Sequence, residues 1–96
     1  VYNAALPDRR PGYDWRGVLP GDDPRALWAG PVAYEKLPRY VNPGSGWLFN
    51  ANNTPFSAAG TGDDLDAGDF APELGVELGQ TNRSRRAWKL MSEAGL

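Results

Sequence analysis

The stretch GWLFNANNTPF, residues 46–56, decides which fold and which chemistry this chain can have. Apolar and polar residues alternate along it, which predicts a strand over residues 46–52. The alternation places Trp47, Phe49 and Ala51 on one face and Leu48, Asn50 and Asn52 on the other, and a further asparagine, Asn53, follows. Asn52 is therefore expected to be presented at the end of a strand.

Asn52 has two interpretations. A neutral amide offers two N–H donors without a charge, which suits a site that stabilises a developing oxyanion. The sequence Asn-Asn-Thr-Pro is also typical of a turn, because asparagine tolerates left-handed backbone geometry and bonds to its own turn. From residue type alone, the turn is the commoner of the two.

Outside this stretch, the composition predicts a loop-rich chain with a thin core. The 96 residues include 12 Gly and 9 Pro, and a chain of this length buries only a modest part of its surface. The net charge of -2 gives no general attraction to nucleic acid or to an anionic membrane, and no apolar run is long enough to span a bilayer. We expect neither nucleic acid nor a membrane as a partner.

The chain contains no cysteine and no histidine. Disulfides, thiol nucleophiles and cysteine zinc sites are thereby excluded, and the commonest general base and transition-metal ligand is missing. Any catalysis must use other groups.

Few regular elements are predicted along the chain. Residues 1–6 form an apolar run that indicates a strand, and a proline or glycine every few residues across residues 7–31 indicates an extended loop. One helical turn is expected before Pro38. The clearest element is a C-terminal helix, in which Ala87, Leu90, Met91 and Ala94 share a face, Thr81 or Asn82 is the N-cap, and Gly95 ends the helix.

Arg83 falls in the first turn of this predicted helix, where the macrodipole disfavours a cation. A carboxylate in a partner segment, or an acidic or acyl-amide substrate, would explain its position. The alternative is an exposed arginine in the run NRSRRAWK whose charge is only solvated.

The loop around Asp63, Asp64, Asp66 and Asp69 offers oxygen ligands suited to calcium, but it lacks the spacing and the closing glutamate of an EF-hand. Solvation of a surface loop is the alternative. The four tryptophans, Trp15, Trp28, Trp47 and Trp88, would suit a sugar-stacking surface, although buried packing explains tryptophans more often.

Several ordered motifs resemble the β-subunit of the penicillin acylase family of N-terminal nucleophile hydrolases, a family that includes acyl-homoserine lactone acylases. The motifs are Tyr2, Pro7-Asp8-Arg9, DWRGVLP at residues 14–20, NPGSG at residues 42–46, NANNTP at residues 50–55, and Arg83 at the start of a helix. The resemblance covers about the whole chain and is strongest over residues 14–55.

The resemblance implies an αββα sandwich as the parent fold, to which this chain contributes an α+β, loop-rich piece with short strands and one C-terminal helix. It also implies a serine nucleophile at the N-terminus of the β-chain, Asn52 as the oxyanion-hole residue, and Arg83 as an organiser of the active site. An aspartate of the acidic loop, Asp63 or Asp64, would bind calcium in the parent enzyme. A periplasmic or secreted location follows in the same way.

We therefore interpret residues 1–96 as a single segment of a penicillin acylase-like amidohydrolase and not as a complete enzyme domain. The parent would cleave the linear amide of an N-acyl substrate, of the penicillin or N-acyl-homoserine lactone class. None of the four serines stands at the chain start, so the nucleophile is expected in the remaining α- and β-subunit segments, and this chain alone is expected to be inactive. The alternative is a small, non-enzymatic carbohydrate- or peptide-binding module.

Overall fold

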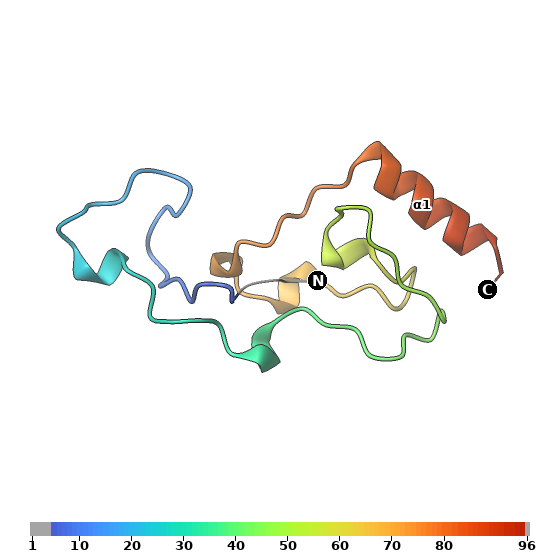
Figure 1. Cartoon of the computed structure of the whole chain (residues 1–96), viewed down its shortest axis with the longest axis horizontal. Coiled ribbons are helices and arrows are strands. Elements are labelled where there is room, and N and C mark those ends of the chain that lie inside the picture. Colours follow the sequence, from blue (N-terminus) through green and yellow to red (C-terminus); the bar gives the residue numbers. More distant parts are fainter. Residues whose placement is uncertain (1–4, 96) are drawn as a thin grey trace. The chain divides into compact units, whose positions relative to one another are not determined.

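Loops and short turns make up most of the chain. The computed structural model describes residues 5–95, and within that range the one α-helix is α1, Asn82–Glu93. Figure 1 shows α1 as the longest coiled ribbon, near the C-terminus. Short 3-10 turns interrupt the loops: η1 Pro24–Ala26, η2 Tyr34–Lys36, η3 Pro55–Ser57, η4 Ala67–Asp69 and η5 Pro72–Leu74.

The C-terminal helix is confirmed, with its predicted ends. Thr81 is the N-cap: its side chain accepts from the Ser84 N–H, and the Ser84 hydroxyl accepts from the Thr81 N–H. This reciprocal pair satisfies two donors that a helix start otherwise leaves without partners. Beyond the helix, Gly95 has a φ of 61°, the left-handed geometry that favours glycine after a helix. The turn η2 confirms the helical turn predicted before Pro38.

The predicted strand over residues 46–52 is wrong, because residues 5–95 contain no strand. Its side chains nevertheless alternate in exposure as predicted: Trp47 is 9% exposed and Leu48 is 50% exposed. The Phe49 N–H donates to the Ala58 carbonyl at 3.0 Å, but one such bond does not make a ladder. The loop-rich character and the C-terminal helix are therefore confirmed, whereas the short strands are not found in the described residues, and the αββα sandwich stays an implication of the family.

The strand predicted over residues 1–6 lies mostly outside the described residues. Next to it, Pro7 and Pro31 form an isolated antiparallel bridge. The Val32 N–H donates to the Leu6 carbonyl at 2.8 Å, and the Asp8 N–H donates to the Gly30 carbonyl at 2.7 Å. These two bonds flank the prolines, which therefore form a non-hydrogen-bonded pair of the antiparallel pattern, a position that does not need the N–H that proline lacks.

The chain divides into two compact units. One comprises the described part of Val1–Leu37 with Phe70–Gly75, and the other comprises Pro38–Asp69 with the described part of Val76–Leu96. The second unit contains the catalytic and metal candidates of the sequence analysis, Asn52, Arg83, Asp63 and Asp64. In the parts of both units that the structure describes, no helix is long and apolar enough to cross a membrane.

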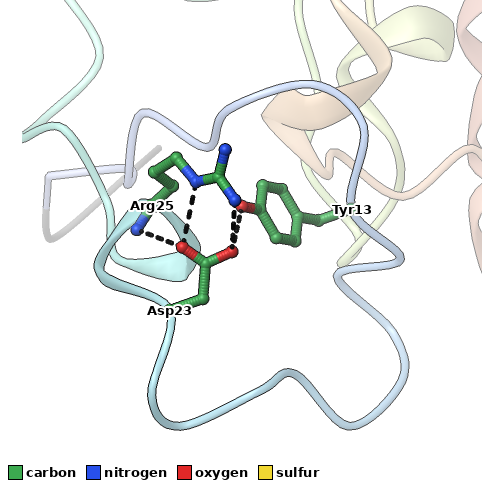
Figure 2. Close-up of polar contacts among 3 residues, drawn as sticks. All are labelled: Tyr13, Asp23 and Arg25. Atoms are coloured by element: carbon green, nitrogen blue, oxygen red, sulfur yellow. Dashed lines mark hydrogen bonds and ion pairs between the residues drawn. The ribbon is translucent and has the colours of Figure 1, made fainter.

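A polar cluster fixes the long loop of the first unit. Figure 2 shows Tyr13 and Arg25 directed at the carboxylate of Asp23; the Tyr13 hydroxyl donates to it at 2.7 Å and the Arg25 Nε at 3.1 Å. The Arg25 hydrogen bond, followed by that of Tyr13, lowers the pKa of Asp23 to about 2. Asp23 stays ionised at neutral pH and caps η1 by accepting from the Arg25 N–H.

The core of the second unit is built around Trp47. Its indole lies against Gly60, and its ring centroid is 6.1 Å from that of Phe49. Ala58 and Ala59, which precede Gly60 in the chain, are also buried, and the two buried polar residues, Thr54 and Ser84, both make hydrogen bonds. This small core supports the segment that carries Asn52.

Candidate functional site

Two of the three clustered asparagines form the turn. The Asn50 side-chain oxygen accepts from the Asn52 N–H at 2.9 Å, and the Asn53 side-chain oxygen accepts from the Ala51 N–H at 2.7 Å. The Asn53 amide nitrogen also donates to the carbonyls of Thr54 and Ser57, at 3.0 and 2.9 Å. Asn50 and Asn53 therefore satisfy the turn interpretation, and the side chain of Asn52 is not used to close the turn.

Asn52 itself has a φ of 57°, one of two described non-glycine residues with positive φ. Asparagine adopts this left-handed geometry more readily than most residues. The Asn52 side chain is exposed and does not take part in closing the turn. The backbone thus requires a residue of this kind at position 52, independently of any chemistry.

Arg83 binds this side chain. One terminal nitrogen of its guanidinium donates to the Asn52 side-chain oxygen at 2.7 Å and to the Ala51 carbonyl at 3.0 Å. Because a guanidinium has no acceptor, it must face the oxygen of the amide, and the amide nitrogen with its two donors points the other way. No described residue accepts a hydrogen bond from that nitrogen. The structure thus brings the two predicted site residues together and fixes the orientation of the amide.

The helix α1 places Arg83 for this contact. Arg83 is the second residue of the helix, after Asn82, and the Thr81–Ser84 capping pair fixes the first turn. A cation there opposes the macrodipole, and the hydrogen bonds to the Asn52 side-chain oxygen and the Ala51 carbonyl offset that cost. The sequence analysis left open an acidic group, a substrate or solvation alone as the reason for Arg83. In the described chain its guanidinium donates to a neutral amide and to a backbone carbonyl.

Asp63 and Asp64 both bind backbone N–H groups. The Asp63 carboxylate accepts from Gly44 at 3.1 Å and from Ser45 at 2.6 Å. One oxygen of Asp64 accepts from Ala58 at 2.7 Å and from Ala59 at 2.8 Å. These bonds connect the acidic loop to the NPGSG turn, residues 42–46, and to residues 58–59, just after the stretch 46–56 that carries Asn52.

These contacts leave the two aspartates poorly arranged for calcium on their own. Calcium takes six to eight oxygen ligands, and residues 5–95 hold no group of three or more carboxylates that would form a cation site. A calcium site at Asp63 or Asp64 would need oxygen ligands from other segments of a longer protein, and it stays a prediction.

Two further residues contact Asp64: Tyr40, which the sequence analysis did not select, and Trp88, which it considered only for a sugar-stacking surface. The Trp88 indole N–H donates to its second oxygen at 3.1 Å, and the Tyr40 hydroxyl lies 3.5 Å from the first. Burial is the main reason why the pKa of Tyr40 is raised above its ordinary value. A part-buried tryptophan needs a partner for its N–H, but sequence alone does not indicate which acceptor supplies it.

The tryptophans do not form a common exposed surface. Trp47 is buried, Trp15 and Trp88 are part-buried, and the indole N–H groups of Trp15 and Trp88 bond to the Arg10 carbonyl and to Asp64. Trp28 is the exposed one of the four. A sugar-stacking module therefore has little support in the described residues.

Comparison with known proteins identifies the family of this chain. The chain belongs to the penicillin amidase family, whose model matches residues 1–95. A curated relative, penicillin G acylase of Escherichia coli, is 40% identical over 55 residues, which is 57% of this chain and 6% of the acylase. No solved structure matches the chain significantly. Since the aligned stretch spans so little of that acylase, the activity, substrates and partners of a whole acylase are proposals for this chain.

Proposed function

We propose that this chain is a segment of a penicillin acylase-like amidohydrolase and that Asn52 is its oxyanion-hole donor. The observation that carries the proposal is the orientation of the Asn52 amide, whose oxygen is held by Arg83 at 2.7 Å while its nitrogen is left to donate. Family membership supports amide hydrolysis as the reaction class.

In the proposed mechanism, a nucleophile from another segment of the parent protein, an N-terminal serine by analogy with the family, attacks the substrate carbonyl. The carbonyl oxygen gains negative charge as the tetrahedral intermediate forms, and an N–H of Asn52 donates to it. A neutral donor holds no counter-ion in the ground state, so its interaction strengthens as the charge develops.

Arg83 has two effects in this mechanism. Its hydrogen bonds to Asn52 and Ala51 fix the orientation of the amide before the substrate arrives. The positive charge next to the amide oxygen also polarises the amide, which makes its N–H groups better donors. Arg83 is thus a positioning residue, whereas Asn52 touches the reacting atom.

The substrate class that fits is a linear N-acyl amide, with penicillins or N-acyl-homoserine lactones as candidates. The remaining α- and β-subunit segments would supply the nucleophile and the pocket for the acyl chain. Export to the periplasm or beyond completes the proposal, by analogy with the family.

The test is Asn52→Asp in the full-length parent enzyme, assayed with an N-acyl amide substrate. Aspartate tolerates the left-handed backbone and can still bond Arg83, but at neutral pH its side chain has no N–H to donate. We expect kcat to fall by about 10²- to 10³-fold or more, the usual cost of removing one oxyanion donor.

Asn82→Ala is the matched control, because Asn82 is an exposed asparagine beside Arg83 that the proposal does not use. It should retain kcat within about twofold, as expected for a surface substitution. Turnover by Asn52→Asp within a few-fold of the wild-type enzyme would refute the proposed function.

A further inference from the structure

The Asp64 carboxylate joins separate segments of the second unit. One oxygen accepts from the N–H groups of Ala58 and Ala59, at 2.7 and 2.8 Å, and the other accepts from the Trp88 indole at 3.1 Å. Bonds to an ionised acceptor are stronger than bonds between neutral groups. Asp64 therefore connects residues 58–59, which follow the stretch that carries Asn52, to helix α1.

On the loop side, these bonds fix the end of the segment that begins at Asn52. The residues between Asn52 and Ala58 are held by the Asn53 and Thr54 side chains and by the short turn η3. The Tyr40 hydroxyl adds to this support, since it donates to the Pro55 carbonyl and accepts from the Leu65 N–H at 3.1 Å. Movement at Ala58 and Ala59 would thus be passed to Asn52 through a short, bonded piece of chain.

On the helix side, Trp88 belongs to α1, the element that carries Arg83. Trp88 and Arg83 are separated by little more than one turn of one helix, so fixing the indole restrains the backbone from which the Arg83 side chain extends. Asp64 therefore bonds on both sides of the Asn52–Arg83 contact. It bonds to Ala58 and Ala59 in the chain that follows Asn52, and to Trp88 in the helix that carries Arg83.

We propose that Asp64 is a positioning residue for the Asn52–Arg83 pair, acting through its hydrogen bonds to Trp88 and to the N–H groups of Ala58 and Ala59. The catalytic consequence rests on the proposed function of Asn52. The role needs no bound cation, because each oxygen of Asp64 already has a donor within the described chain.

The geometry suggests an isosteric test. In the Asp64→Asn variant, the remaining side-chain oxygen can keep the two backbone N–H groups, which leaves the new NH2 facing the Trp88 indole N–H. Two donors then meet, and the contact between loop and helix is lost. Trp88→Phe removes the indole N–H, so in the double variant the NH2 no longer faces a donor.

The experiment compares Asp64→Asn, Trp88→Phe and the double variant in the full-length enzyme. Asp64→Asn should lower kcat on the order of tenfold while KM stays within about twofold, because small misplacement of a catalytic group affects the transition state most. The double variant should recover kcat to the level of Trp88→Phe alone, a non-additive result expected for residues in direct contact.

Asp66→Asn is the matched control. Asp66 lies in the same loop, but its described bond is local, from the Gly68 N–H at 2.8 Å. It should leave kcat within about twofold of wild type. A second readout, independent of activity, is hydrogen exchange followed by mass spectrometry: Asp64→Asn should raise exchange both in peptides covering residues 54–64 and in peptides covering residues 82–93.

The two proposals fail in different ways. If Asn52→Asp is inactive but Asp64→Asn keeps wild-type kcat, or if the double variant shows the sum of both losses, the positioning role is wrong and the proposed function stands. If Asn52→Asp retains turnover, the proposed function is wrong, and exchange then decides the structural link: unchanged exchange in either peptide group of Asp64→Asn would overturn it.

Discussion

At residue 52, backbone and side chain impose separate demands that few residue types meet together. The left-handed φ of 57° favours glycine, asparagine or aspartate. The bond from Arg83 requires an oxygen, which excludes glycine, and the proposed role as an oxyanion donor requires an N–H, which excludes aspartate. Asparagine alone among these three satisfies every demand, so a turn residue can also have the proposed role.

Gly60 is a second residue whose identity is set by its neighbours. Its φ is 106°, and an added Cβ would lie 2.8 Å from the Cζ2 atom of Trp47. Gly60→Ala should therefore displace the indole and destabilise the second unit by about 1–3 kcal/mol, from backbone strain and overpacking together. We expect a lower apparent Tm of the full-length protein and faster hydrogen exchange over residues 47–52.

The control for this substitution is Gly79→Ala. Gly79 is exposed, has no neighbouring atom within 4 Å of an added Cβ, and does not have a positive φ. It should leave both measurements close to wild type. Equal behaviour of the two variants would show that the Gly60–Trp47 contact does not limit stability.

Among the elements, α1 depends on its first turn. Thr81→Ala removes the acceptor for the Ser84 N–H at 3.1 Å and breaks the reciprocal pair. Loss of such a cap costs about 1 kcal/mol of helix stability. Because Arg83 lies in this turn, we expect faster hydrogen exchange over residues 82–86 and a few-fold loss of kcat in the full-length enzyme, on the order of what 1 kcal/mol allows.

Thr61→Ala is a suitable comparison, since Thr61 is an exposed threonine in a loop of the same unit. It should change neither exchange in α1 nor kcat. If Thr81→Ala leaves the exchange of α1 unchanged, the capping pair does not hold the helix start.

The elements also differ in how well the sequence predicts them. The helix is predicted correctly, with both ends, because its periodicity and its capping residues Thr81 and Gly95 are local signals. The strand over residues 46–52 is not, although its alternation is right: an extended segment becomes a strand only beside a partner, and local pattern does not supply one. The αββα sandwich depends on such long-range pairing and rests on the family alone.

The candidate site shows the same division. Residue type makes Asn52 a candidate, and its unfavourable place on the helix dipole makes Arg83 one, but local chemistry leaves the turn as the commoner interpretation of Asn52 and solvation open for Arg83. The roles of both residues come from the family resemblance. Their contact spans 31 positions and depends on the path of the intervening loop. The contact between Asp64 and Trp88 spans 24 positions and has no local signal, so only the structure reveals it.

For the whole molecule, the described core is small for the number of large side chains present. The buried hydrophobic residues are Trp47, Ala58, Ala59 and Leu74, and two of these are alanines. In the first unit Val18, Leu27 and Trp28 are 102%, 67% and 63% exposed. Such exposed side chains support the proposal that other segments of a parent protein cover this one.

The isolated 96-residue chain should therefore unfold without a cooperative transition. A 12-residue helix is marginal by itself in water. Among the described residues, the first unit buries one leucine and the second a tryptophan and two alanines, which is too little apolar surface to offset the conformational entropy of this many loop residues. We expect a gradual loss of far-UV circular dichroism on heating and binding of a hydrophobic dye at low temperature. A single sharp transition, with the same midpoint by circular dichroism and by tryptophan fluorescence and without dye binding, would show instead that this segment folds by itself.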